Sequence, residues 1–158
     1  MRKLNVTLVT AYRSILKIEE EFAKHSGTPN ISANEMHMID VIGTGPNGSR
    51  TVKEIASALH ITQPSVTAAV NRLEKKGCVE RIRSTEDGRV VYIHLTRFGH
   101  KIHSLYRRFH ENMVRSIAKD LTDEEKLSLI KGMTSLIEFF DAQSSNILEK
   151  SQKDTEEN

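Results

Sequence analysis

A very tight connection between two helix patterns, around residues 60–62, limits the folds open to this chain. Thr51 and Glu54 have the spacing of a capping box, and the apolar residues that follow recur with a helical period, so a short helix is expected after Thr51. Thr62 is a good N-cap, and Pro64 suits the first turn of a second helix. The sequence therefore predicts a helix-turn-helix.

A β-hairpin follows the second helix directly. Gly77 provides the helix stop, and the runs CVERIRS and RVVYIHL are rich in β-forming residues. Turn-forming residues at 85–88 separate the two runs, and Val91, Ile93 and Leu95 alternate as expected for a half-buried strand. Helix, tight turn, helix and hairpin in this order are typical of a winged helix-turn-helix, whose last helix lies in the DNA major groove.

Four further helices flank this segment. Ser32 and Glu35 form a second capping box, which predicts a helix from there to about Gly43. Thr96 is expected to cap a helix of about 20 residues, and Thr122 begins the last helix. An amphipathic N-terminal helix to about Phe22 is indicated by Leu4, Leu8, Ala11, Ile15 and Phe22. The last helix is apolar on more than one side, so a second subunit is expected to cover it.

The composition excludes several classes of protein. A chain of 158 residues with 37% hydrophobic residues has room for one core of ordinary size. Its one cysteine excludes an intramolecular disulfide and CxxC metal sites, and favours a reducing compartment. No apolar run approaches the roughly 20 residues that span a bilayer. We therefore expect a cytoplasmic protein with no membrane partner. The common nucleophile, P-loop and HExxH motifs are absent, so an enzyme is not expected.

Charge is unevenly divided along the chain. Residues 51–115 carry 12 basic and 6 acidic groups, whereas residues 116–158 carry 5 and 10. A basic middle third is consistent with a polyanionic partner. On the helix that starts at Thr62, Val66, Val70 and Leu73 form an apolar stripe, and the outer face carries short polar groups and one arginine. Such groups can read base edges, so this helix is the candidate recognition helix.

These observations predict a set of DNA contacts. Thr51, Ser65 and Thr67, with backbone N–H groups at helix starts such as that of Thr62, are expected to bind phosphates. Arg89, at the hairpin tip, is expected to read an A·T-rich minor groove, and Asp87 to hold a neighbouring arginine. The residues expected to read base edges or thymine methyl groups are Gln63, Ala68, Asn71 and Arg72.

The chain resembles the MarR family of dimeric repressors. The resemblance rests on the LEKKG helix end, the VER strand, the D-G-R wing and the LT-x-x-G entry into the following helix. It implies a mainly α fold, a winged helix-turn-helix whose N- and C-terminal helices form a dimerisation domain. The expected segments are a dimerisation helix and turn (1–31), the DNA-binding domain (32–95), dimerisation helices (96–149) and a disordered tail (150–158). Two recognition helices would contact a pseudo-palindromic operator.

Within the family, ISANEMHMIDVIG and LTRFGHKIHSLYRRFHENMV are similar to the FabT-type repressors of bacterial fatty-acid synthesis genes. That similarity implies long-chain acyl-acyl carrier protein as the corepressor, and no other cofactor. An apolar slot for the acyl group is expected from Met36, Ile39, Ile102, Leu105, Phe109 and Met113. The acidic carrier needs a basic landing surface, for which the candidates are Lys101, Arg107 and Arg108.

Other effectors and partners remain open on the sequence. Some MarR-type regulators respond to zinc, and the candidate ligands here are His37, His100, His103 and His110, of which His100 and His103 have helical i, i+3 spacing. A thiol switch would use Cys78, whose pKa the nearby Lys75 and Lys76 could lower, whereas a cysteine buried at this strand start would be inert. Small aromatic or oxidant signals are further alternatives. A winged helix used only for protein contacts would bind its partner without the steep salt dependence of DNA binding.

Overall fold

The computed structural model describes residues 1–27 and 30–156, with side chains through residue 143. The chain forms two compact units, Met1–Phe109 and His110–Asn158, and the division falls inside one long helix. The expected segments divide the chain at residue 95 instead. Three contacts place the start of that helix in the first unit: Tyr106 bonds to Glu19 and His37, and Phe109 stacks on Phe22 with 4.4 Å between ring centroids.

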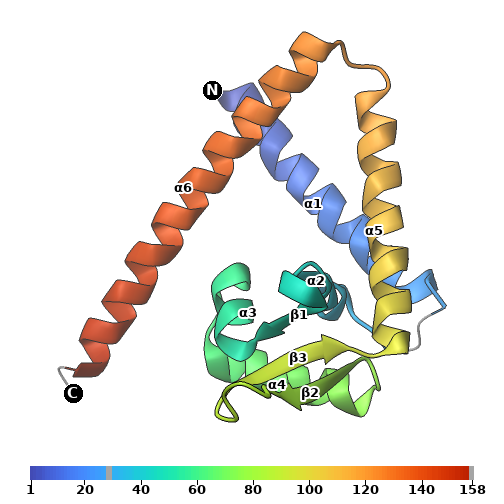
Figure 1. The fold of residues 1–158 in the computed structure, drawn as a ribbon. Coiled ribbons are helices and arrows are strands. Elements are labelled where there is room, and N and C mark those ends of the chain that lie inside the picture. Colours follow the sequence, from blue (N-terminus) through green and yellow to red (C-terminus); the bar gives the residue numbers. More distant parts are fainter. Residues whose placement is uncertain (28–29, 157–158) are drawn as a thin grey trace. The chain divides into compact units, whose positions relative to one another are not determined.

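Six α-helices and three short strands make up the described chain (Figure 1). The first unit contains α1 (Arg2–His25), α2 (Ala33–Gly43), a 3₁₀ turn (Pro46–Gly48), β1 (Ser49–Thr51), α3 (Val52–Leu59), α4 (Gln63–Lys75), β2 (Val79–Arg83) and β3 (Val91–Leu95). The helix α5 (Arg97–Ala118) crosses the division, and α6 (Asp123–Glu156) lies in the second unit. The expected mainly α winged-helix fold is confirmed. The backbone of α6 continues past residue 150, where the sequence predicts a disordered tail, and residues 157–158 lie outside the described part.

Side-chain caps start the helices where the sequence places them. The capping boxes of Ser32 with Glu35 and Thr51 with Glu54 are both complete. Thr62 Oγ1 accepts from the backbone N–H of Ser65, and Thr96 Oγ1 accepts from that of Gly99. Each cap satisfies backbone N–H groups that have no partner within the helix, which fixes where the helix begins.

The sheet has the strand order β1-β3-β2, with antiparallel pairing throughout. The β2–β3 hairpin was expected, and Val79 lies opposite Leu95. The strand β1 was not predicted from the sequence; in it, Ser49 pairs with His94 and Thr51 with Tyr92. The strand β1 immediately precedes α3 and pairs with β3, so it connects the β2–β3 hairpin to the helices α2 and α3.

One apolar core fills the first unit between α2, α3, α4, the sheet and the start of α5. Its fully buried side chains include Ile39, Ile55, Leu73, Ile93 and Ile102. Close packing also explains a glycine at the start of α5. A Cβ on Gly99 would lie 2.0 Å from the carbonyl oxygen of Cys78, so only glycine fits there. No helix among the described residues is both long and apolar enough to cross a bilayer.

Candidate nucleic-acid interface

The turn between α3 and α4 is made by a left-handed residue. His60 has φ 51° and ψ 41°, and its N–H bonds back to the carbonyls of Ala56 and Ser57. Ile61 N–H also bonds to Ala56 O at 3.1 Å, so the chain reverses within three residues before Thr62 caps α4. The two helices are thereby set at a fixed angle, as a helix-turn-helix requires.

The helix α4 has one buried and one exposed side. Val66, Val70 and Leu73 are fully buried, which confirms the predicted stripe. The residues predicted to contact DNA on α4 and at its N-cap are all exposed: Thr62, Gln63, Ser65, Thr67, Ala68, Asn71 and Arg72. Lys75 is exposed too, and lies on the same outer face as Ala68 and Asn71 by helical spacing. Lys75 is not among the predicted contacts, although its charge and its place on α4 can both be seen in the sequence.

Ion pairs with α2 occupy one flank of α4. Lys76 Nζ lies 2.8 Å from Glu35 Oε1, and Arg72 Nε lies 3.9 Å from the same oxygen. Burial raises the pKa of Glu35, but the bonds from Lys76 and Ser32 outweigh it and hold the pKa below its ordinary value. Arg72 therefore lies on the α2 side of the recognition surface. Its side chain is still 59% exposed and can reach DNA from that side.

The opposite flank of α4 contacts the wing. Arg81 on β2 donates to Asn71 Oδ1 at 2.6 Å and also pairs with Glu74. Sequence reasoning missed Arg81, because nothing in a one-dimensional pattern indicates that β2 lies beside this flank. Asn71 is therefore exposed but already engaged through its oxygen.

Two residues predicted to contact phosphate or support a contact have partners of their own. The Thr51 hydroxyl donates to Glu54 Oε2 at 2.9 Å, so a phosphate at this helix start would compete with a carboxylate. At the wing tip, Asp87 Oδ1 accepts from the backbone N–H of Arg89 at 3.0 Å. Asp87 was expected to pair with an arginine side chain, and the structure instead gives it a backbone partner. The reason is local, because an Asp two residues before an N–H closes this turn readily.

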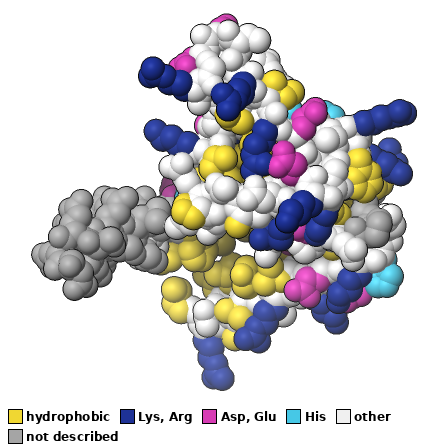
Figure 2. All heavy atoms as spheres, turned by 90° about the horizontal axis from the view of Figure 1, so that it is seen from below, with side chains coloured by type: hydrophobic (Ala, Val, Ile, Leu, Met, Phe, Trp, Pro, Cys, Tyr) yellow, Lys and Arg dark blue, Asp and Glu magenta, His cyan; other side chains and the backbone are white. Residues whose placement is uncertain are grey.

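The surface around α4 and the wing carries exposed cations. Arg89 is exposed and belongs to the loop that joins β2 to β3 (Figure 1). Figure 2 views the molecule from below and shows Lys and Arg side chains around this face, with Asp and Glu between them. Short polar groups and cations on an exposed helix beside a projecting hairpin are suited to the DNA backbone and base edges.

The four candidate zinc ligands are placed in separate surroundings. His37 Nε2 lies 3.2 Å from Glu19 Oε2, and His103 Nε2 lies 3.1 Å from Asp40 Oδ1. His100 is exposed on α5, and His110 belongs to the second unit. Within the described residues, no group of three or more His, Cys, Asp or Glu side chains is arranged to hold a metal ion.

Cys78 is buried at the start of the wing. Burial raises the pKa of its thiol, and the nearby Glu35 charge raises it further. The Lys76 charge lowers this pKa, but by less than either of these effects raises it. The thiol-switch alternative needs the lysines to lower this pKa, and burial outweighs them. A buried thiol with a raised pKa reacts slowly with oxidants.

The predicted acyl-slot residues fall into three groups. Met36, Ile39 and Ile102 are buried in the core, and Leu105 and Phe109 are half-buried on α5. Met113 belongs to the second unit. An acyl chain would thus have to displace packed side chains to reach the first three. The predicted carrier-docking residues are all exposed on α5, as docking requires: Lys101, Arg107 and Arg108.

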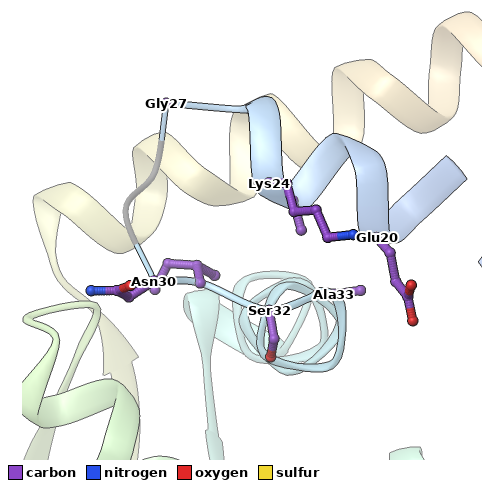
Figure 3. A pocket seen from close by; sticks show the side chains of 8 residues that line it. Glu20, Lys24, Gly27, Asn30, Ser32 and Ala33 are labelled. Atoms are coloured by element: carbon purple, nitrogen blue, oxygen red, sulfur yellow. The ribbon is translucent and has the colours of Figure 1, made fainter. Parts of the chain in front are cut away.

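A separate hollow of about 770 Å³ lies between the end of α1 and the start of α2. Figure 3 shows Glu20 and Lys24 on the α1 side and Ser32 and Ala33 at the start of α2. Its other lining residues include the apolar Ala23 and Ile31. None of the six predicted acyl-slot residues lines this hollow.

Comparison with known proteins gives consistent matches. The family model described as MarR family matches residues 30–90. A crystal structure of Streptococcus pneumoniae FabT in complex with DNA is 39% identical, covers 90% of this chain and 98% of that one, and superposes with a TM-score of 0.83. The regulator FarR of Neisseria gonorrhoeae is 27% identical over 132 residues, which are 82% of this chain and 85% of FarR.

A further relative is the HTH-type regulator YpoP of Bacillus subtilis. It is 30% identical over 109 residues, which are 67% of this chain and 74% of YpoP. These relatives are transcriptional regulators and not enzymes. The match to FabT extends over both the winged-helix segment and the flanking helices, because it covers nine-tenths of the chain.

Proposed function

The chain belongs to the MarR family of transcriptional regulators, and from this premise we propose that it is a homodimeric, cytoplasmic repressor of fatty-acid biosynthesis genes. Long-chain acyl-acyl carrier protein would promote its binding to operator DNA. One observation carries the proposal: the likeness to FabT covers 98% of that protein, including the helices that flank the winged helix. A likeness limited to the DNA-binding segment would support only the general family function.

The exposed apolar residues support a dimer. The helix α1 exposes Leu4, Val6, Tyr12 and Ile18, and α6 exposes a second set, Leu127, Leu129, Ile130, Met133, Ile137, Phe139 and Phe140. Large contiguous apolar surfaces are unusual on monomers and mark interfaces. A second copy would bury them and present two α4 helices to half-sites about 34–36 Å apart.

An acyl-carrier effector is supported by the exposed basic residues Lys101, Arg107 and Arg108 on α5. Carrier protein is acidic, and opposite charges steer such partners together. The acyl group would enter beside Leu105 and Phe109, which are half-buried, and reach Met36 or Ile39 only as the core opens. A corepressor can favour the DNA-binding state only by binding that state more tightly, and a hundredfold preference corresponds to about 2.7 kcal/mol of coupling.

The test compares effectors on one DNA. The purified dimer selects a duplex from a randomised library, and its affinity for that duplex is then measured alone and with free fatty acid, carrier protein, long-chain acylated carrier or zinc. We expect tighter binding only with the acylated carrier. Tightening by zinc with the acylated carrier inert would reject the fatty-acid role in favour of a metal-responsive MarR regulator. No response to any of these would reject the proposed corepressor.

A variant links the response to the docking surface. Replacing Arg107 and Arg108 together by Glu should abolish the effect of the acylated carrier and leave the affinity of the protein alone within about twofold, because these residues lie on α5 and not on α4 or the wing. The matched control reverses Arg115, which is exposed on the same helix, to Glu. Equal losses in the two variants would mean that carrier docking does not involve the proposed residues.

A further inference from the structure

The side chain of Asn71, on the exposed side of α4, is held by the wing. Arg81 Nη2 donates to Asn71 Oδ1 at 2.6 Å, and Arg81 Nη1 donates to Glu74 Oε2. Asn71 and Glu74 are three residues apart, so they are neighbours on one flank of the helix. One planar guanidinium from β2 therefore bridges two side chains of the candidate recognition helix, in a geometry that a flexible ammonium would not reproduce.

The orientation of the Asn71 amide follows from the chemistry of its partner. A guanidinium carries only donors, so the Asn71 atom that faces Arg81 must be the carbonyl oxygen. The NH₂ group, with two donors, is then turned away from Arg81. Because Asn71 is exposed, these donors are available to a ligand that covers α4.

Arg81 itself is poorly placed to be a principal DNA contact. Its charge is paired with Glu74, and its side chain is only 31% exposed. Lys75 and Arg83 are exposed and can bind phosphates directly. The bond to Asn71 is therefore the contact through which Arg81 can affect recognition.

We propose that Arg81 is a positioning residue for sequence readout, which fixes Asn71 as a hydrogen-bond donor toward a base edge. This inference rests on the proposed role of α4 in binding operator DNA. Bidentate pairing with adenine needs the amide oxygen to accept from N6 while the nitrogen donates to N7. With its oxygen bonded to a cation, Asn71 loses acceptor strength and its N–H groups become stronger donors.

The base preference follows from this polarity. Guanine presents two acceptors in the major groove, O6 and N7, and thymine presents O4. Asn71 should therefore select guanine or thymine at one position in each half-site. An asparagine with both ends of its amide available would instead pair bidentately with adenine.

The experiment uses the full-length protein and a randomised duplex library. The wild-type protein, Asn71→Ala and Arg81→Ala are each taken through selection, and affinities are measured on the duplex that the wild-type protein enriches. We expect a guanine or thymine preference at one position per half-site, lost in both variants. Arg81→Ala should bind the selected duplex about tenfold more weakly, within the range of one good base contact.

Arg83→Ala is the matched control. It removes the same charge from the same strand, and the Asn71 oxygen accepts its bond from Arg81 and not from Arg83. This control should weaken binding to all sequences alike and leave the selected motif unchanged. Arg81→Lys guards against misfolding of the alanine variant, because it keeps the charge but cannot bridge Asn71 and Glu74 with a planar fork. It should weaken the same preference.

A double variant tests whether the two residues act together. Arg81→Ala added to Asn71→Ala should cause no further loss of preference, since Arg81 acts through Asn71. Adenine at the position that Asn71→Ala affects, an unchanged motif in Arg81→Ala, or a uniform loss like that of the Arg83 control would overturn the inference and leave DNA binding intact. If the wild-type protein enriches no motif, sequence-specific DNA binding itself fails, and the inference fails with it.

Discussion

The winged-helix segment buries most of its large apolar residues within one chain, whereas α1 and α6 leave most of theirs exposed. Ile39, Ile55 and Leu73 are fully buried in the first region. On α6, by contrast, Leu127 is 67% exposed, and on α1 Val6 is 57% exposed. The same kind of residue thus has two different roles. In the winged helix it stabilises one chain, and on α1 and α6 it is available to stabilise contact with a second chain.

This difference separates the DNA-binding part of the protein from the part that would join two chains in the proposed dimer. The first requires only intramolecular packing. The second would gain its packing from another molecule, so its stability should depend on protein concentration. Substitutions in the two regions should therefore give effects that can be told apart by varying concentration.

The largest expected effect comes from the core. Ile55→Ala should lower the free energy of unfolding by about 3 kcal/mol, because it removes buried methyl groups and leaves a cavity. Chemical denaturation at several protein concentrations measures this loss, which should be the same at each. Ile82→Ala is the control, since it is the same change at a residue that is 45% exposed in the same unit. A loss in the control as large as that of Ile55→Ala would remove the distinction between core and surface.

The next effect should appear in assembly rather than in folding. Ile137→Glu places a charge on an exposed apolar face of α6 and should convert the dimer to monomers. Affinity for a two-half-site duplex should fall about 100-fold, because binding of the two winged helices is no longer linked. Sedimentation and DNA titration measure the two changes, and circular dichroism should show the helices retained.

A control on the same helix sharpens this result. Ser135→Glu adds the same charge at an exposed position on α6. Ser135 lies two residues before Ile137 in the sequence, and helical spacing places it on the polar side of the helix. It should remain dimeric. If Ile137→Glu also remains a dimer with full DNA affinity, the exposed residues of α6 do not form the interface.

The smallest effect concerns the ion pair that joins α2 to α4. The pKa of Glu35 is below its ordinary value of 4.5, so the folded state holds this proton less tightly than the unfolded state does. The contribution of Glu35 to stability is therefore present above about pH 4.5 and is lost as the pH falls through the folded pKa. Glu35→Gln should cost about 1.5 kcal/mol near pH 7, in line with hydrogen bonds to a charged group.

The pH dependence of this loss is the measurement that identifies its cause. Unfolding at pH 7 and at pH 3 should show the difference between Glu35→Gln and the wild-type protein shrinking at the lower pH. The exposed Glu80→Gln is the control and should change stability by less than about 0.5 kcal/mol at either pH. A difference for Glu35→Gln that stays constant with pH would show that its charge is not what stabilises the contact.

Much of the fold was predictable from local chemistry. Thr62 identified the start of α4 because a capping side chain bonds to backbone groups only three residues away. The capping box of Ser32 with Glu35 and the alternating burial of β3 were predictable for the same reason, because both depend on residues close together in the sequence. The strand β1 was not predictable, because Ser49, Arg50 and Thr51 show no apolar alternation, and their partners on β3 are more than 40 residues away.

The site was predictable as a set of exposed residues but not as a set of contacts. The buried stripe of Val66, Val70 and Leu73 determined which α4 residues face outward, and the structure agrees. The partners of those residues were not visible, since Glu35 and Arg81 come from elements elsewhere in the chain. Asp87 shows the same limit on a small scale, because a backbone N–H took the place of the expected arginine.

The sequence by itself determined which residues begin the helices α2 to α6, which side of α4 is buried, and the membership of the chain in its family. These depend on interactions within about four residues, or on motifs at fixed spacing. Only the tertiary structure decided that Arg81 holds Asn71, that burial outweighs lysine at Cys78, and that three predicted acyl contacts are already packed in the core. Those outcomes depend on which distant segments lie side by side and, at Cys78, on how strongly burial disfavours a charge.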